Sequence, residues 1–221
     1  MKAIIKGYDP DFPLIKIIIF QIIINGIPML LNDKEIRGSL VEMLLSRSQK
    51  PKRIIHELSI SNGNAIADVV AVNKQLHCYE IKGDGDKIER LKSQGFFYNQ
   101  SFPKITLVTT NKHLSRALKN IPSFWGVIIA YKSKNADEIK LKYIRKASEN
   151  SLLVKNSALQ TLWKDEMMSL MSHYGLHMKK SDMNKSNISR EISSKLNKKE
   201  LNEHISSLLK NRQSSFVKHI S

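Results

Sequence analysis

Residues 65–82 read AIADVVAVNKQLHCYEIK, two apolar runs joined by a short polar link. Runs rich in valine favour β-strands, and a link as short as Asn73-Lys74-Gln75 favours an antiparallel hairpin. With the turn centred near Lys74, residues whose numbers sum to about 148 face each other. Cross-strand neighbours have Cβ atoms roughly 4.5–5.5 Å apart. The hairpin therefore predicts that Asp68 and Glu80 form a close pair.

The segments on both sides of this hairpin predict a larger sheet with helices. Asn32 caps a helix that begins at Asp33. Further helices are expected at 86–99 and 112–119, and further strands at 54–60, 104–110, 125–131 and, at an edge, 138–145. The strand, helix and strand over 104–131 indicate a right-handed parallel crossover. The predicted fold class is α/β of the α+β kind: a mixed β-sheet flanked by helices, with a C-terminal helical extension.

The chain divides into three predicted regions. Residues 1–28 form an N-terminal extension or an extra strand, 29–147 the core, and 148–221 a C-terminal helical region. One helix is expected over 156–174, ended by Gly175, followed by two short helices at 188–196 and 199–211. Two interpretations of these helices stay open. The preferred one is a cap that packs on the core through Trp163 and the leucines, and the other is a helix-turn-helix-like unit that binds DNA.

The predicted pairing of Asp68 with Glu80 suggests a metal site. Two carboxylates this close repel unless a positive charge lies between them, and magnesium prefers oxygen ligands. Lys82 lies two residues after Glu80, on the same face of its strand, where an ammonium stabilises charge on a phosphate. The alternative is a cross-strand salt bridge on an exposed face, which the bare motif supports equally well.

The helix after the hairpin adds a polar stripe. Asp86, Arg90, Gln94 and Tyr98 recur every four residues, and the last three offer hydrogen-bond donors for phosphate oxygens. A solvated helix surface is the alternative.

A third carboxylate near the predicted metal site has several candidates. Glu35 comes first, although it lies three residues after Asn32 and can instead complete a capping box. Glu42 and Glu57 are the other two.

The composition favours a polyanionic partner. The 221 residues carry a net charge of +16 with a pI near 9.8, and 41% are hydrophobic, enough for a folded core. Residues 151–221 hold twelve Lys and Arg against six Asp and Glu, so the charge is not confined to a tail. The single cysteine, Cys78, fits a cytoplasmic protein without disulfides. The apolar run at 14–24 is shorter than the roughly 20 residues of a membrane helix, so no membrane partner is expected.

These residues resemble the PD-(D/E)XK phosphodiesterase superfamily, which has the restriction-endonuclease-like fold. The resemblance covers about residues 29–131 and rests on Glu35, Asp68 and Glu80-Ile81-Lys82 in that order. Gln94 and Tyr98 are similar to the Gln-x-x-x-Tyr motif of its RecB-like branch. A small bacterial family within the superfamily is similar in four core segments and in the tail. These segments are 33–37, 79–82, 90–94, 125–126 and 162–166.

The resemblance implies a magnesium- or manganese-dependent nuclease that hydrolyses phosphodiester bonds of DNA. Asp68, Glu80 and the backbone carbonyl of Ile81 would bind the metal, with Glu35 and Lys82 completing the catalytic set. Arg90, Gln94 and Tyr98 would bind the substrate. A basic residue expected just before Asp68 is missing. The alternative is a catalytically silent DNA-binding or scaffold protein with the same fold. The expected partner is nucleic acid, DNA above all, and a homodimer or a larger defence or repair complex stays open.

Overall fold

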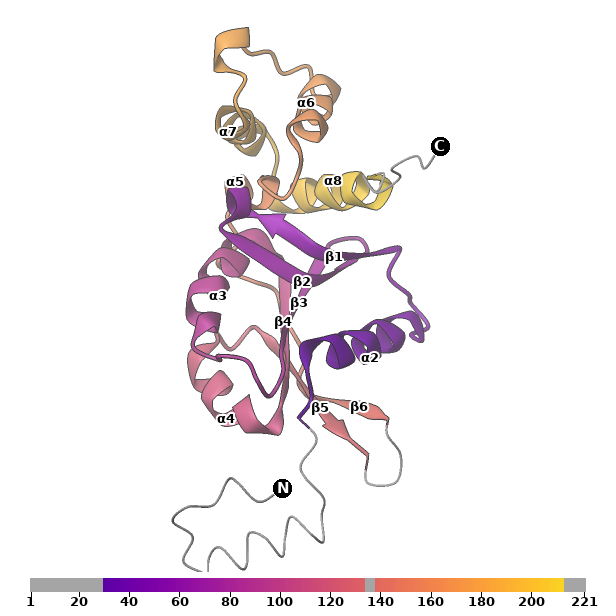
Figure 1. Ribbon diagram of the computed structural model, residues 1–221. Helices are drawn as coiled ribbons and strands as arrows, with labels where there is room; N and C mark the ends of the chain where they lie inside the picture. Colours follow the sequence, from indigo (N-terminus) through magenta and orange to yellow (C-terminus); the bar gives the residue numbers. More distant parts are fainter. Residues whose placement is uncertain (1–29, 134–137, 213–221) are drawn as a thin grey trace, which may run out of the picture. The chain divides into compact units, whose positions relative to one another are not determined.

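The structure is a computed structural model that describes residues 30–133 and 138–212 (Figure 1). The extension or extra strand expected within residues 1–28 lies outside the described residues. From Leu31 onward the described chain forms one compact unit. None of its helices combines the length and the apolar character that a bilayer crossing requires.

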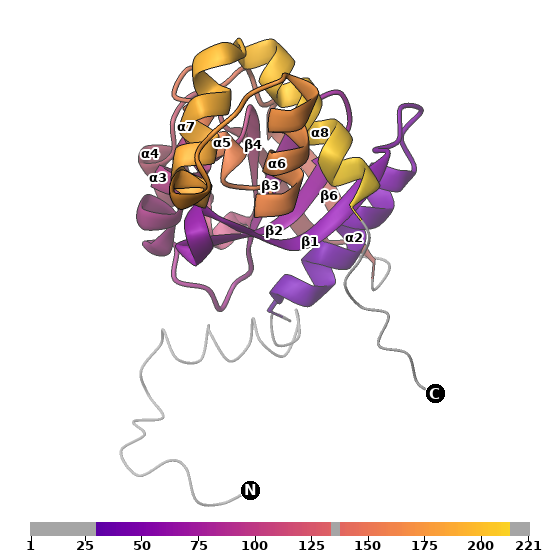
Figure 2. The same ribbon diagram turned by 90° about the horizontal axis from the view of Figure 1, so that it is seen from above.

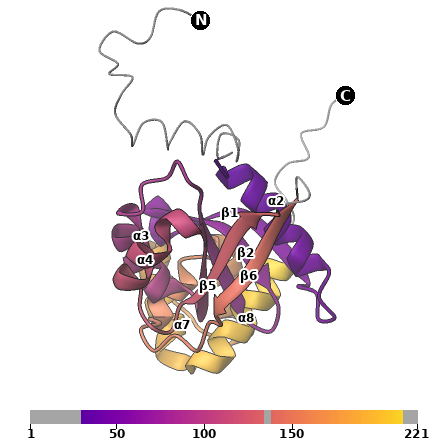
Figure 3. The same ribbon diagram turned by 90° about the horizontal axis from the view of Figure 1, so that it is seen from below.

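The described residues form a six-stranded mixed sheet in which every strand neighbours the next one along the chain. The first three strands and the last two pair antiparallel, whereas β3, β4 and β5 run parallel. The edge strands are therefore β1 and β6, and β6 lies beside β5 (Figure 3). The strands are β1 (Arg53–Ile60), β2 (Ala65–Val72), β3 (Leu76–Lys82), β4 (Lys104–Thr110), β5 (Gly126–Lys132) and β6 (Ile139–Arg145).

The central hairpin has the predicted register. Val69 faces Tyr79 and Val70 faces Cys78, so the paired residue numbers sum to 148. The parallel pairing of β4 with β5 through an intervening helix is also confirmed. The mixed α+β class with a C-terminal helical region is the fold of the protein.

Helices cover both faces of the sheet (Figure 1). Ile36, Leu40 and Leu44 of α2 pack with β2 and β3 residues on one face. The other face packs against α3, α4 and the C-terminal helices. The helices are α2 (Asp33–Leu45), α3 (Arg90–Ser101), α4 (Asn111–Asn120), α5 (Lys155–Leu159), α6 (Lys164–His173), α7 (Lys185–Lys195) and α8 (Lys198–Asn211), with short 3-10 turns at Ser61–Gly63 and Lys180–Asp182.

The C-terminal helices gather over β1 and β2 (Figure 2). Leu201, Ile205 and Leu209 of α8 are buried in the same apolar cluster as Leu58 and Val72 of the sheet. Trp163 is 48% exposed, so the prediction that it anchors this packing is wrong. The cap is buried instead by its leucines together with isoleucines and methionines such as Ile188, Ile192 and Met167.

Two predicted helices have different limits. The helix expected over 156–174 is interrupted, because Trp163 adopts an extended backbone and caps α6, where its N–H donates to Glu166 Oε2 at 2.6 Å. The helix expected from residue 86 begins at Arg90. Asp86 instead accepts a hydrogen bond from the Gly83 N–H at 2.7 Å, which holds it in the preceding loop.

Two glycines give opposite predictions for stability. A Cβ at Gly83 would lie 2.7 Å from the Leu31 carbonyl oxygen, whereas one at Gly38 would meet nothing within 4 Å. We expect Gly83→Ala to lower the free energy of unfolding by about 1–3 kcal/mol, since backbone has to move. Gly38→Ala, inside α2, should raise it by about 0.5–1 kcal/mol. Urea unfolding monitored by circular dichroism measures both, and equal effects of the two substitutions would contradict this packing.

Candidate functional site

Asp68 on β2 and Glu80 and Lys82 on β3 lie together at the centre of the sheet. The N–H of Ile81 donates to Asp68 Oδ2 at 2.7 Å, which links the two strands at this point. Glu80 is completely buried and Lys82 is 6% exposed. The two carboxylates therefore lie on adjacent strands as predicted, with Glu80 buried and Asp68 partly exposed at 22% of its side chain.

Glu80 is surrounded by groups of the protein itself. Lys82 Nζ makes an ion pair with Glu80 Oε1. The Tyr98 hydroxyl, on α3, lies 2.6 Å from Glu80 Oε2 and 2.7 Å from the Ile66 carbonyl oxygen. A phenol has one proton and donates to one acceptor at a time. Both contacts are satisfied together when the Glu80 carboxyl is protonated and donates to the Tyr98 oxygen.

The electrostatics of the pair agree with this arrangement. Burial, followed by the nearby charge of Asp68, raises the pKa of Glu80 to about 7, although Lys82 and Tyr98 act in the opposite direction. Burial also raises the pKa of Asp68, against the effect of the Ile81 N–H and Lys82. The low-dielectric surroundings of these carboxyls therefore favour their neutral forms.

Arg37, on α2, is the residue that the sequence did not reveal. Its guanidinium donates to the Asp68 carbonyl oxygen at 2.8 Å and to Asp68 Oδ1 at 3.3 Å. It also pairs with Asp33 Oδ2 at 2.9 Å, one helical turn earlier. The basic group expected just before Asp68 in the chain thus comes from another element. The Asp33 and Arg37 spacing was visible in the sequence, but the contact with Asp68 spans 31 residues.

The other predicted site residues are placed less favourably. Glu35 completes the capping box with Asn32, as its alternative interpretation required: the Asn32 N–H donates to Glu35 Oε2 at 3.1 Å. Gln94 Nε2 lies 3.4 Å from the Tyr98 hydroxyl, whereas Arg90 is exposed at the start of α3. Of the polar stripe, only Tyr98 contacts a buried carboxyl, that of Glu80, and Gln94 contacts Tyr98.

The residues around Asp68 and Glu80 do not fit a magnesium or manganese ion. All four carboxyl oxygens have a hydrogen-bond partner in the protein, in the order Oδ1, Oδ2, Oε1 and Oε2 with Arg37, the Ile81 N–H, Lys82 and Tyr98. Across residues 30–133 and 138–212, no three His, Cys, Asp or Glu side chains are grouped to hold a metal. Metal binding stays a prediction. The residues present disfavour it, because Lys82 and Arg37 already place positive charge beside Glu80 and Asp68.

The raised pKa of Glu80 predicts a pH dependence of stability. The folded protein keeps a proton between pH 4.5, the ordinary pKa of the carboxyl, and about 7. Stability linked to Glu80 is therefore present below pH 4.5 and lost as the pH rises to about 7, by at most about 3 kcal/mol. We expect the unfolding free energy of Glu80→Gln, relative to wild type, to rise across this range in urea titrations. Glu42→Gln, at an exposed position, is the control. If the plots of unfolding free energy against pH for Glu80→Gln and wild type stay parallel, the Glu80 carboxyl is not protonated in the folded protein.

One solved structure shows a weak likeness to this chain. A protein of unknown function from Silicibacter pomeroyi is 18% identical, with 57% of this chain and 84% of that chain covered. The TM-score of 0.35 is too low to establish a shared fold.

The family comparisons give a definite result. The model of the family described as bacteriophage P4 protein cII matches residues 29–221. Protein cII of Enterobacteria phage P4 is 30% identical over 184 residues, which cover 83% of this chain and 68% of the phage protein.

These matches correct the interpretation of the motif. The assignment to the PD-(D/E)XK superfamily is wrong, and so is the metal-dependent DNA nuclease that it implied. The motif misled because an Asp and a Glu-x-Lys on adjacent strands are short enough to arise in a buried, internally compensated network. From the match across residues 29–221, the chain belongs to the bacteriophage P4 protein cII family.

Proposed function

We propose that this protein binds DNA without cleaving it, through a lysine-lined surface along α8. The observation that carries the proposal is a pair of hollows of about 320 and 460 Å³ that share Lys74 and Glu203 as lining residues. We call this surface the lysine trough. Its lysines are Lys52, Lys74, Lys198, Lys199 and Lys210.

The way α8 packs gives the trough its floor. Leu201, Ile205 and Leu209 are buried against the sheet, so the opposite face of the helix is left to solvent. Lys74, in the turn between β2 and β3, adds a wall from the sheet side. A lysine held on a rigid scaffold loses less freedom on binding than one on a mobile segment.

The charges in the trough are unbalanced. Within the described parts of the chain, none of its five lysines makes an ion pair, and only Glu149 and Glu203 carry negative charge there. Glu149 is already paired with Lys104 at 3.6 Å. With the net charge of +16, this favours a polyanion, since phosphate neutralisation supplies most of non-specific DNA affinity.

Ser206 adds a polar group suited to phosphate. It is 3% exposed, it lines the smaller hollow, and its hydroxyl has no hydrogen-bond partner within the described residues. Buried hydroxyls nearly always have a partner, and serine is among the side chains that contact phosphate oxygens. Ser206 thus places a polar side chain beneath the hollow that Lys52 and Lys210 also line.

Neutralising the trough tests the proposal. The trough variant combines Lys74→Gln, Lys198→Gln and Lys199→Gln. The control removes the same charge from exposed positions on and beside α3 and α4, with Lys87→Gln, Lys92→Gln and Lys119→Gln. We expect the trough variant to lose about tenfold or more in DNA affinity, and its salt slope to fall by about one per lost phosphate contact.

Fluorescence anisotropy with labelled DNA at several salt concentrations measures affinity and slope, and gel analysis of the same DNA checks that it stays intact. Equal losses in the trough and control variants would refute the trough as the binding surface. Absence of DNA binding by the wild-type chain at low salt would refute the proposed function.

A further inference from the structure

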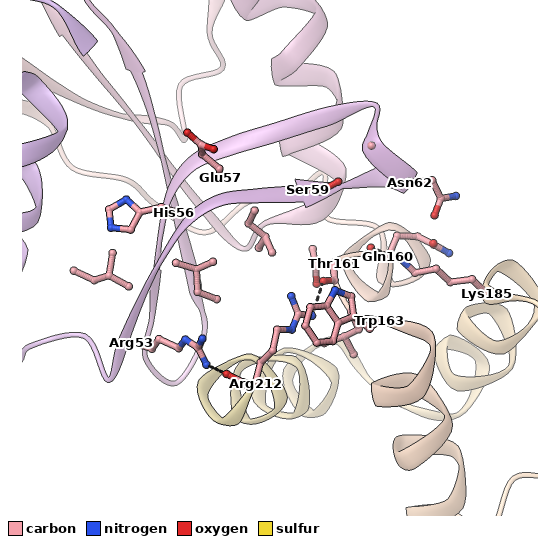
Figure 4. Close-up of a pocket in the computed structure, with 15 residues that line it drawn as sticks. Arg53, His56, Glu57, Ser59, Asn62, Gln160, Thr161, Trp163, Lys185 and Arg212 are labelled. Carbon is pink, nitrogen blue, oxygen red and sulfur yellow. Dashed lines mark hydrogen bonds between the residues drawn. The ribbon is translucent and has the colours of Figure 1, made fainter. Parts of the chain in front are cut away.

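A third hollow, of about 580 Å³, lies between β1 and the C-terminal helices (Figure 4). Arg53 and His56 line it from the strand side. Trp163, Lys185 and Arg212 line it from the helical side. We call it the tryptophan groove. Its volume falls in the range of about 300–1,000 Å³ that small-ligand sites occupy.

Trp163 is held in place although it is 48% exposed. Its backbone caps α6, and the Arg212 guanidinium lies 4.3 Å from the centroid of its ring. Arg212 is in turn fixed by Glu166, with contacts of 2.7 and 2.5 Å, and by the Thr161 carbonyl oxygen at 3.1 Å. The indole of Trp163 is thus fixed in position without being buried, and its exposed part offers a flat surface for stacking.

Positive charge gathers around this indole. Lys185 Nζ donates to the Gln160 carbonyl oxygen at 2.9 Å, and burial together with Arg212 lowers the pKa of Lys185. Arg53, on the opposite wall, donates to the carbonyl oxygens of Leu209 and Lys210 at the end of α8. Lys185 is also the first residue of α7, where the helix dipole favours an anion. Arg212 is already paired with Glu166, so the charge that an anion in the groove would balance is that of Lys185.

The tryptophan groove and the lysine trough meet at the end of α8. Lys52 lines the trough and its neighbour Arg53 lines the groove. Likewise, Lys210 lines the trough and Arg212 lines the groove. A strand whose backbone follows the trough therefore has a path into the groove.

We propose that the tryptophan groove binds one nucleotide of a single-stranded DNA segment, with the base stacked on Trp163 and the phosphate at Lys185. This inference rests on the proposed DNA binding and adds to it the form of the strand. A base paired inside a duplex has no free face for an indole, whereas an unpaired base does. Stacking of one base on an aromatic side chain contributes about 1–3 kcal/mol and tolerates any sequence.

Binding of a labelled single-stranded oligothymidylate and of a duplex of equal length tests this inference. We expect Trp163→Ala to weaken single-strand binding by about 5- to 100-fold while duplex binding changes less than about twofold. Trp163→Phe, which keeps a ring, should retain most of the single-strand affinity. Phe96→Ala removes an aromatic side chain of 58% exposure from α3 and is the matched control.

Intrinsic fluorescence gives a second measurement on the full chain. The protein has two tryptophans, and Trp125 is completely buried. Single-stranded DNA should therefore quench the wild-type emission through Trp163 and leave Trp163→Phe nearly unchanged. Thermal unfolding of each variant shows that the fold is retained.

The outcomes separate this inference from the proposed function. Unchanged single-strand affinity in Trp163→Ala, with binding still lost in the trough variant, overturns the groove and leaves DNA binding standing. Equal losses for single strand and duplex also overturn the groove as a site for an unpaired base. Failure of the wild-type chain to bind either DNA overturns both.

Discussion

The burial of Glu80 at the centre of the sheet is the constraint on which the surrounding structure depends. A carboxyl group with no access to water destabilises the fold unless it is paired, hydrogen-bonded or protonated. Lys82, on the same strand, forms an ion pair with Glu80, and Tyr98, on α3, forms a hydrogen bond with it. Arg37, on α2 at the other face of the sheet, donates a hydrogen bond to Asp68. These polar contacts therefore fix the positions of both helical layers relative to β2 and β3.

The buried polar residues of the sheet therefore stabilise the fold, and the proposed binding surfaces lie elsewhere. Each carboxyl oxygen at the centre already has a hydrogen-bond partner in the same chain, so the residues that looked catalytic act within the fold. Among the described residues, the lysines that make no ion pair include those of the lysine trough, around α8. The match to the bacteriophage P4 protein cII family spans residues 29–221 and so includes both the sheet and the C-terminal helices.

The sequence predicted local features well and long-range contacts poorly. The hairpin register followed from two apolar runs and a short link, because strand pairing there depends on neighbours in the chain. The break before α6 was missed, because Leu159, Leu162, Met167 and Leu170 keep a helix-like spacing across it and all four are buried. The pairing of Arg37 with Asp68 had no local pattern at all. The tryptophan groove joins β1 to residues more than a hundred positions later, so only the folded chain reveals it.

The shared apolar cluster of the sheet and the C-terminal helices also bears on biosynthesis. Leu58, Ile60 and Val72 emerge from the ribosome well before Leu201, Ile205 and Leu209, which cover the same cluster. Bacterial-type elongation adds about 5–20 residues each second, so the apolar face of the first hairpin stays incompletely covered for several seconds. During that interval the nascent chain presents a hydrophobic surface to chaperones and to other nascent chains. The apolar cluster is fully covered only when α8 has packed on the sheet.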